Sequence, residues 1–293
     1  MRTLSGSFVY EMDKNVEPAW EVEPGETVKA ETPDCFNGQI KSDEDTLEDL
    51  DMTQVNPATG PIYVKDAEPG DTLLVTIEEI KVKSPGVQGI VPGFGLLQDE
   101  FDEPLVTVHE IDEEGIEFEG KKLPVHPMIG TIGVAPEGKP VLCSTPGAHG
   151  GNLDTPDVRP GVTLKFPVFH EGALLSLGDG HALQGDGEVC GVSIEVATTT
   201  TLTVDVEKET ISTPLIEGED EFITLGSDED LEGACRIALR AMVDYLSNNT
   251  TLSPQDAYKL CSVATDMKVS QVVNPLRTAR VSVKKEIVEK FQG

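Results

Sequence analysis

The feature that most constrains the fold is a series of short apolar and β-branched runs, each ended by glycine or proline, that extends to about Thr213. A typical run is Asp71-Thr-Leu-Leu-Val-Thr-Ile-Glu-Glu-Ile80. Runs of this length and composition predict β-strands joined by tight turns. The pattern Pro-Gly-x-Thr starts at Pro24, Pro69 and Pro160, where we expect type II turns that lead into strands, although chance recurrence of a common turn explains the repeat equally well.

The residues after Thr213 change to helical spacing. Ser227-Asp-Glu-Asp230 has the pattern of a helix N-cap, and apolar residues then recur at Leu231, Cys235, Ala238, Met242 and Tyr245. Ser253 would cap a second helix, with Pro254 in its first turn. We expect Cys235 and Cys261 to be small core residues on the apolar stripes of these helices. Residues 267–273 are predicted to return to strand, and residues 283–291 to form a short closing helix.

Strands followed by a late helical pair predict an α+β, mainly β fold with β-sandwich-like sheets and a helical pair near the C-terminus. A chain of 293 residues is long enough for one large domain or two moderate ones. We expect a single intertwined unit over residues 1–293, strand-rich over 1–213 and helix-containing over 214–293.

The chain has a formal net charge of −31, from 53 acidic and 22 basic residues. Such a surface repels polyphosphates and anionic lipids, so we expect no binding to nucleic acid or to membranes. The five cysteines are widely spaced and form no Cys-x-x-Cys pair, which favours a reduced setting. The first residues lack the apolar run of a signal peptide, and no stretch is long enough to span a bilayer. These features predict a cytoplasmic protein.

Two glycine-rich segments contain His149 and His181, in Pro146-Gly-Ala-His-Gly-Gly-Asn-Leu-Asp154 and in the stretch from Gly178 to Cys190. Residues 162–177 between them alternate as one strand, which would bring Glu171 beside both loops. The resulting group of acids and imidazole is Asp154, Glu171, Asp179, His181, Asp186 and Glu188. Acids held close together either raise one pKa, giving a general acid or base, or bind a metal that neutralises them. Taken singly, each acid is an ordinary turn residue.

These two segments resemble the signature of the acetamidase/formamidase family. The similarity is continuous over Pro146–Asp154 and Val168–Gly191, and it extends over most of residues 22–273. Flanking pieces that agree are Pro69-Gly-Asp-Thr-Leu, His126-Pro-Met-Ile-Gly-Thr-Ile-Gly-Val-Ala-Pro136 and Met267-Lys-Val-Ser-Gln-Val-Val273. The resemblance implies hydrolysis of formamide, acetamide or a similar short amide to ammonia and a carboxylate. It also implies a β-rich fold that assembles as a homodimer or a higher homo-oligomer.

The positions that match the family signature are His149, Asp154, Glu171, His181 and Glu188, and Asp34 matches an early acidic position. We expect a divalent metal, most simply zinc, to be bound by Asp34, Asp154, Asp179 and His181. Zinc suits hydrolysis because it lowers the pKa of bound water and polarises a carbonyl group. Calcium at a second site is a further possibility that the acidic turns allow.

Roles for the remaining signature residues follow from the same hypothesis. Glu171 or Glu188 would act as the general base for the attacking water. His149 would protonate the leaving ammonia or hold the carbonyl oxygen. The amides of Gly150 and Gly151, together with Asn152, would form the oxyanion and substrate site.

Two other hypotheses remain open. Cys190 lies two residues after Glu188, so a thiolate beside His181 could attack the amide directly, although Cys190 is also a plausible buried core residue. A protein of another class would keep the fold but only bind a metal or an amide, as the acidic surplus and the Gly-Asp-Gly turns suggest. His149 and His181 argue against calcium alone, because this hard ion prefers oxygen ligands. Release of ammonia from short amides separates the enzyme from the binding protein.

Overall fold

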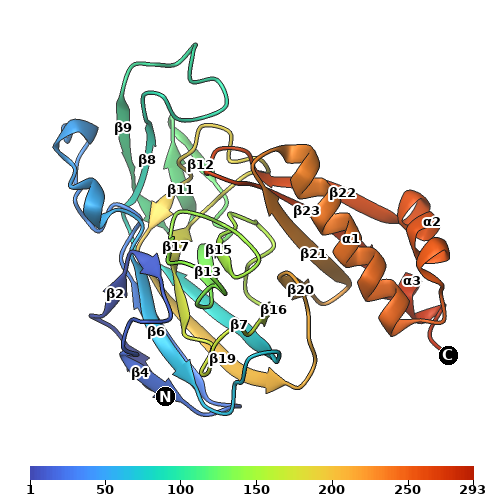
Figure 1. The fold of residues 1–293 in the computed structure, drawn as a ribbon. Helices are drawn as coiled ribbons and strands as arrows, with labels where there is room; N and C mark the ends of the chain where they lie inside the picture. Colours follow the sequence, from blue (N-terminus) through green and yellow to red (C-terminus); the bar gives the residue numbers. More distant parts are fainter.

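The computed structural model describes the backbone of residues 1–293 and every side chain except that of residue 48. Two nine-stranded sheets form its centre (Figure 1). The first sheet has the order β1 (Arg2–Leu4), β5 (Thr27–Thr32), β19 (Thr198–Glu207), β7 (Thr72–Val82), β16 (Val162–Pro167), β20 (Leu215–Glu217), β21 (Glu221–Asp228), β23 (Arg277–Lys284) and β22 (Thr265–Gln271).

The second sheet carries the residues of interest for function. Its main path has the order β15 (Gly150–Asn152), β13 (Met128–Gly133), β17 (Leu175–His181), β18 (Glu195–Val196), β8 (Gly86–Ile90) and β9 (Leu105–His109). Strand β6 (Ala58–Val64) also pairs with β17, and it is joined by β2 (Phe8–Val9) and β4 (Trp20–Val22).

The main hydrophobic core lies between the two sheets. Val75 and Leu164 come from the first sheet, Ile132 and Leu177 come from the second, and all four are fully buried in one cluster. Neither sheet closes into a barrel. The structure therefore confirms the predicted α+β, mainly β fold with sandwich-like sheets.

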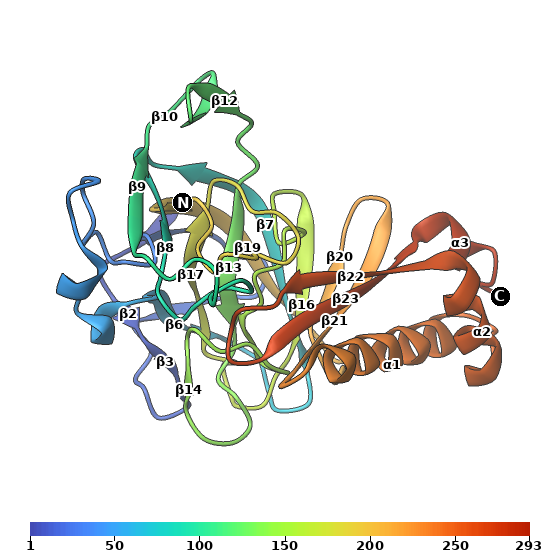
Figure 2. The ribbon, with the colours of Figure 1, turned by 90° about the horizontal axis from the view of Figure 1, so that it is seen from above.

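The helices are concentrated near the C-terminus: α1 (Leu231–Asn249), α2 (Pro254–Ala264) and α3 (Lys285–Glu289). Helix α1 lies along β21 and β23, in a part of the molecule that projects from the sandwich (Figure 2). The predicted cap of α2 is confirmed, since the Ser253 side chain accepts a hydrogen bond from the Asp256 amide and Pro254 begins the helix. No helix among the described residues is long and apolar enough to cross a lipid bilayer.

Two details of α1 differ from the prediction. Its N-cap is Asp230, whose side chain accepts a hydrogen bond from the Gly233 amide, while Ser227 belongs to β21. The buried stripe of α1 runs through Ala234, Ala238, Met242 and Leu246. Cys235 lies beside that stripe and is only half-buried, whereas Cys261 of α2 is buried as predicted.

Small elements complete the chain. Strands β10 (Ile111–Asp112), β11 (Gly115–Phe118) and β12 (Lys121–Leu123) form a separate three-stranded sheet, and β3 (Glu11–Met12) pairs with β14 (Val141–Leu142). Two short 3-10 helices span Leu47–Asp49 and Met52–Gln54. The predicted turns before β5, β7 and β16 are present, with positive φ at Gly25, Gly70 and Gly161.

The single strand expected over residues 162–177 is wrong. Strand β16 ends at Pro167, and β17 begins only at Leu175. Between them, Gly172, Ala173 and Leu174 have φ values of 75°, 56° and 61°. Three successive residues in this left-handed conformation break an extended strand. The chain therefore crosses from the first sheet to the second within these residues.

Candidate functional site

Three candidate side chains lie on two neighbouring strands of the second sheet. Asp179 and His181 end β17 and project from the same face, because they are two residues apart. Glu195 begins β18 and is the direct cross-strand partner of His181. Nε2 of His181 lies 3.1 Å from Oε2 of Glu195 and 3.5 Å from Oδ1 of Asp179. All three side chains are buried, so their charges interact without screening by water.

Two further acids reach this position from loops. Ligand atoms of Asp154, His181 and Glu188 lie within 4.8 Å of one another. Asp154, Asp179 and Glu188 have φ values of 38°, 58° and 45°. Residues other than glycine rarely adopt this left-handed conformation, and strain of this kind accumulates at functional sites. The backbone is thus held in a costly form that presents these carboxylates to one centre.

In each of the four acids, Asp154, Asp179, Glu188 and Glu195, one carboxylate oxygen accepts a hydrogen bond from another group of the protein. Ser193 serves both glutamates: its hydroxyl donates to Oε1 of Glu188 and its backbone N–H donates to Oε1 of Glu195, each over 2.9 Å. The donors to the Oδ2 atoms of the aspartates are Asn274 at 2.6 Å from Asp154, and Asn56 and Thr131 at 3.4 Å from Asp179.

Gln184 fixes the orientation of the imidazole. Its amide nitrogen donates to the backbone oxygen of Asp154 over 2.7 Å, which leaves its Oε1 to accept from Nδ1 of His181 over 2.9 Å. With Nδ1 occupied in this way, Nε2 is the ring nitrogen that faces the acids. This arrangement is typical of a histidine that binds a metal through one nitrogen and is held by a protein acceptor at the other.

Negative charge exceeds positive charge at this centre. Burial raises the pKa of Asp154 to about 6 and that of Glu195 to about 7, and the neighbouring charge of Asp179 adds to both shifts. Burial lowers the pKa of His181, but Glu195 and Asp179 outweigh it and raise that pKa well above its usual value. Among the residues that the structure describes, no lysine or arginine forms an ion pair with these acids.

The donor set fits a divalent cation. Oδ1 of Asp154 and Oε2 of Glu195 are buried and have no hydrogen-bond partner among the described residues. The approach of Glu195 to His181 therefore lacks the direction of a hydrogen bond, as expected when both groups point at a common ion. Carboxylate oxygens and an imidazole nitrogen are ligands that zinc and similar ions accept. Two groups of residues could hold such an ion: Asp154, His181 and Glu188, and Cys35, Asp179 and Glu195.

Two predicted site residues lie apart from these groups. Asp34 is half-buried, and its Oδ1 accepts hydrogen bonds from the amides of Phe36 and Gly38 over 2.9 and 3.1 Å, so it shapes the turn rather than joining either group. Glu171 is exposed and accepts a hydrogen bond from the Tyr63 hydroxyl over 2.8 Å. The break after β16 turns Glu171 outward, so its predicted place beside the glycine-rich loops is wrong.

His149 and residues 150–154 are buried, but His149 belongs to neither acidic group, and its Nε2 has no hydrogen-bond partner among the described residues. Burial lowers the pKa of His149 to about 4, and its ring lies beside Gly147 and Gly151. The amide of Gly150 donates to the carbonyl of Gly147 over 3.1 Å, which leaves it unavailable to an oxyanion in this structure. Asn152 is buried, and its Oδ1 accepts a hydrogen bond from Thr131 over 2.8 Å. Asn152 therefore supports the frame around Asp179.

Cys190 does not lie on a strand with Glu188, because residues 188–191 form a turn closed by a hydrogen bond from the Gly191 amide to the Glu188 carbonyl. Its thiol donates to the carbonyl of Val192 over 3.3 Å. Asp186, another member of the predicted group, instead pairs with Arg280 over 2.6 Å. The cysteine that the fold brings to the acids is Cys35.

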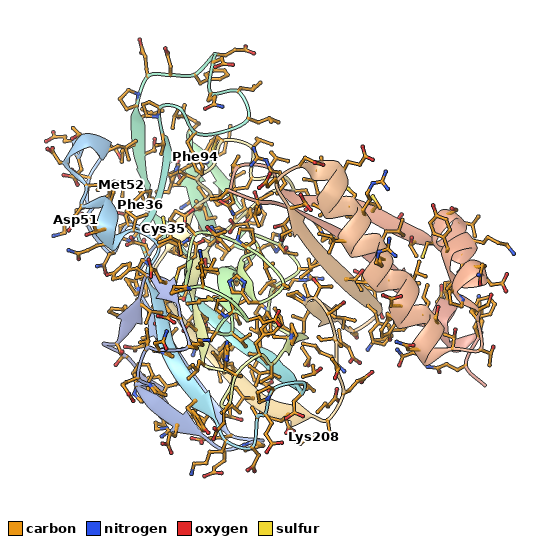
Figure 3. The ribbon with its side chains drawn as sticks, viewed as in Figure 1. Cys35, Phe36, Asp51, Met52, Phe94 and Lys208 are labelled. Carbon is orange, nitrogen blue, oxygen red and sulfur yellow. The ribbon has the colours of Figure 1, made fainter. Side chains whose placement is uncertain are left out.

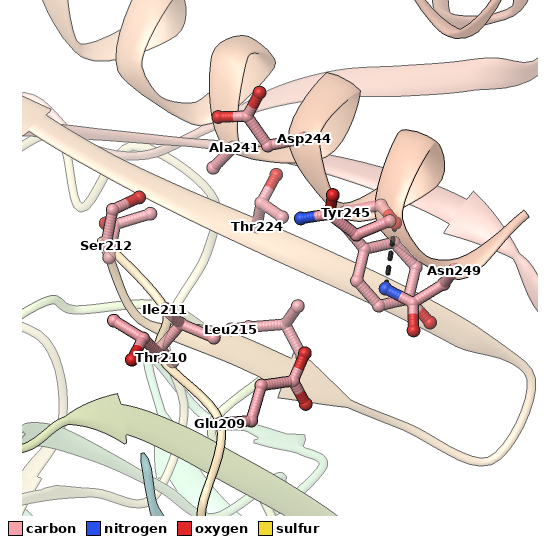
Figure 4. Close-up of a pocket in the computed structure, with 12 residues that line it drawn as sticks. Glu209, Thr210, Ile211, Ser212, Leu215, Thr224, Ala241, Asp244, Tyr245 and Asn249 are labelled. Atoms are coloured by element: carbon pink, nitrogen blue, oxygen red, sulfur yellow. Dashed lines mark hydrogen bonds between the residues drawn. The ribbon is translucent and has the colours of Figure 1, made fainter. Parts of the chain in front are cut away.

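A cavity of about 220 Å³ borders the acidic centre at Glu188. Its polar lining includes Gln184, Glu188 and Ser193, and its apolar lining includes Phe118 and Leu183. A separate cavity of about 420 Å³ lies between residues 209–215, β21 and α1, where Tyr245 and Asp244 line it (Figure 4). None of the residues that line this second cavity belongs to the acidic centre, whereas Glu188 lines the smaller one.

The comparisons with known proteins agree with these features. The sequence profile of the acetamidase/formamidase family matches residues 10–144 and 137–290. A solved acetamidase from Bacillus halodurans is 43% identical, with a TM-score of 0.96 over 99% of both chains. A predicted acetamidase/formamidase from Thermoanaerobacter tengcongensis is 41% identical, with a TM-score of 0.96 over 99% of this chain and 97% of its own.

A curated formamidase from Methylophilus methylotrophus is 30% identical in an alignment of 241 residues, with coverage of 60% of this chain and 58% of the relative. The alignments with the curated relatives each span less than two thirds of the relative's own length.

Proposed function

Because the chain belongs to the acetamidase/formamidase family, we propose that it hydrolyses short aliphatic amides, such as formamide and acetamide, to a carboxylate and ammonia. The observation that carries this proposal is the buried, unpartnered Oδ1 of Asp154, a residue whose ligand atom lies within 4.8 Å of those of His181 and Glu188. The 220 Å³ cavity that Glu188 lines suits a substrate of only a few heavy atoms.

The ligands of the cation would be Asp154 and His181, with Asp179 close to both. The ion is most simply zinc, which accepts this mixed oxygen and nitrogen set. When bound, such an ion polarises a carbonyl group and lowers the pKa of a water molecule. Gln184 holds the imidazole in the tautomer that presents Nε2.

Glu188 is the acid best placed to move a proton. It lines the cavity, and its Oε1 is fixed by the Ser193 hydroxyl. Burial raises its pKa well above the usual value, and the charge of Asp154 adds to the shift. A carboxylate with a raised pKa is a stronger base, so Glu188 can take a proton from water and pass it to the amide nitrogen as the C–N bond breaks.

We also propose that the protein forms a homo-oligomer and that it is cytoplasmic. Both sheets have end strands because neither closes into a barrel, and such edges favour a homodimer or a higher homo-oligomer, as the family resemblance implies. The acidic composition and the free cysteines favour a cytoplasmic setting. Light scattering of the purified protein measures the first, and microscopy of the tagged protein in its own cell measures the second.

The activity is tested by measuring ammonia release from formamide, acetamide, propionamide and butyramide. We expect kcat/KM to fall along this series once the substrate outgrows the cavity. Asp154→Asn and Glu188→Gln should each lower kcat by about 100-fold or more. Glu171→Gln is the matched control, because that glutamate is exposed, and it should retain the rate. Absence of ammonia with all four amides would refute the proposal.

A further inference from the structure

A cysteine forms part of the acidic centre. Cys35 lies in the turn that follows β5, and its side chain is 9% exposed. Figure 3 shows it where this segment meets the body of the sheets. Its sulfur and one oxygen each of Asp179 and Glu195 lie within 4.8 Å of one another. This group shares no residue with the group of Asp154, His181 and Glu188.

The free oxygen of Glu195 points to a ligand at this group. Oε1 of Glu195 is held by the Ser193 amide, but Oε2 is buried and has no hydrogen-bond partner among the described residues. Asp179 shows a similar division, because Asn56 and Thr131 approach its Oδ2 while its Oδ1 faces His181. Leaving a buried carboxylate oxygen unpaired costs free energy, because the oxygen loses its hydrogen bonds to water. A cation would remove that cost.

The charge of the whole centre leaves room for a second ion. Asp154, Asp179, Glu188 and Glu195 carry four negative charges when ionised, and one divalent ion neutralises only two of them. His181 is the one basic side chain that approaches them within ion-pair distance among the described residues. Since Nε2 of His181 lies near acids of both groups, the two groups are adjacent. Two-ion hydrolase sites place their ions about 3.5–4 Å apart.

We propose that Cys35, Asp179 and Glu195 form a second cation subsite, which takes a thiophilic divalent ion such as zinc beside the ion of Asp154 and His181. The inference rests on the proposed function, since it adds an ion to the same centre. Thiolate is a soft ligand and favours zinc over calcium or magnesium. Cys35 therefore sets which metal enters this subsite, and its proton leaves when the metal binds.

The competing arrangement has a single ion, with the Cys35 thiol and one carboxyl group kept protonated. Cobalt distinguishes the two, because a thiolate ligand gives Co²⁺ a charge-transfer absorption in the near ultraviolet that oxygen and nitrogen ligands do not give. The full-length protein is stripped with a chelator and titrated with Co²⁺ without oxygen. We expect two equivalents per chain and the thiolate band with one of them.

Cys35→Ala should bind one equivalent and lose the band. Cys235→Ala is the control, because Cys235 is half-buried on α1, outside both groups, and it should keep both equivalents and the band. Near-ultraviolet circular dichroism verifies that each variant is folded. If Cys35→Ala does not fold, the number of equivalents and the thiolate band in the wild-type titration still test the second subsite. One equivalent, or two without the band, would overturn the second subsite. Binding of a single equivalent would refute only the second subsite and would leave the proposed metal-dependent hydrolase standing. Absence of any bound cobalt would refute both.

Discussion

Gln184 holds His181 through a 2.9 Å hydrogen bond to Nδ1, and the same amide anchors the backbone of Asp154 over 2.7 Å. One side chain therefore positions two of the proposed metal ligands. Gln184→Ala frees the imidazole to rotate, and loss of such a partner lowers metal affinity by about 10- to 100-fold. Competition with a chromophoric chelator measures this change. An affinity for zinc equal to that of the wild type would show that Gln184 has no positioning role.

Gly130 makes room for the acids. A methyl group at this position would clash with Oδ1 of Asp154 and would lie 2.7 Å from Oδ2 of Asp179. We expect Gly130→Ala to abolish metal binding and to lower the free energy of unfolding by about 1–3 kcal/mol. Gly138→Ala is the control, because nothing lies within 4 Å of its added Cβ. Urea denaturation measures the free energy of unfolding of both variants, and elemental analysis measures their metal content. Equal values for Gly130→Ala and Gly138→Ala would contradict the prediction.

Replacing Glu188 should separate stability from activity. Glu188→Gln keeps the shape of the side chain but removes one buried negative charge that repels Asp154. The metal-free variant should therefore unfold at the same temperature as the metal-free wild type or at a higher one, while kcat falls by about 100-fold or more. Calorimetry with parallel kinetics measures both quantities. A large drop in stability would mean that Glu188 serves the fold and not the chemistry.

Stability of the metal-free protein should fall as pH rises from about 4 to 7. Asp154 and Glu195 have pKa values of about 6 and 7, both raised by burial, so the folded state binds more protons than the unfolded state in this range. The raised pKa of His181 extends the decline above pH 7, while the lowered pKa of His149 opposes it between about 4 and 6.5. Urea midpoints across pH measure the slope.

Excess zinc should reverse that slope, because metal binding requires deprotonated ligands and tightens as pH rises. If metal-free stability instead rises steadily between pH 4 and 7, the four acids are not held together with unneutralised charge.

The fold was largely predictable from local pattern. Turn residues at Pro69-Gly70, the cap at Ser253 and the change to helical spacing each act over a few neighbouring residues. The strand over residues 162–177 was mispredicted because alternation persists through Gly172, whose positive φ breaks the strand. Glu171 was assigned to the centre on that basis, and in the structure it is exposed.

The centre itself was only half predictable. Asp154, Asp179, His181 and Glu188 stand in two glycine-rich segments, so their proximity could be inferred. Glu195 was missed because its place depends on the pairing of β18 with β17. Cys35 and Asn274 each lie more than 100 residues from Asp154 along the chain, and neither has a neighbouring motif. Glu195 lies only four residues beyond Gly191, the end of the second glycine-rich segment. This short distance was the one feature of the sequence that could have pointed to Glu195.

The dependence of ammonia release on a stoichiometric metal tests the central claim most directly. The protein is stripped with a chelator, and zinc is added back in steps while metal content and the rate of acetamide hydrolysis are both measured. We predict that the stripped protein has no activity and that the rate of the wild type returns in proportion to the metal bound. The rate of Asp154→Asn should not return. A stripped protein that hydrolyses acetamide at the full rate would contradict the account.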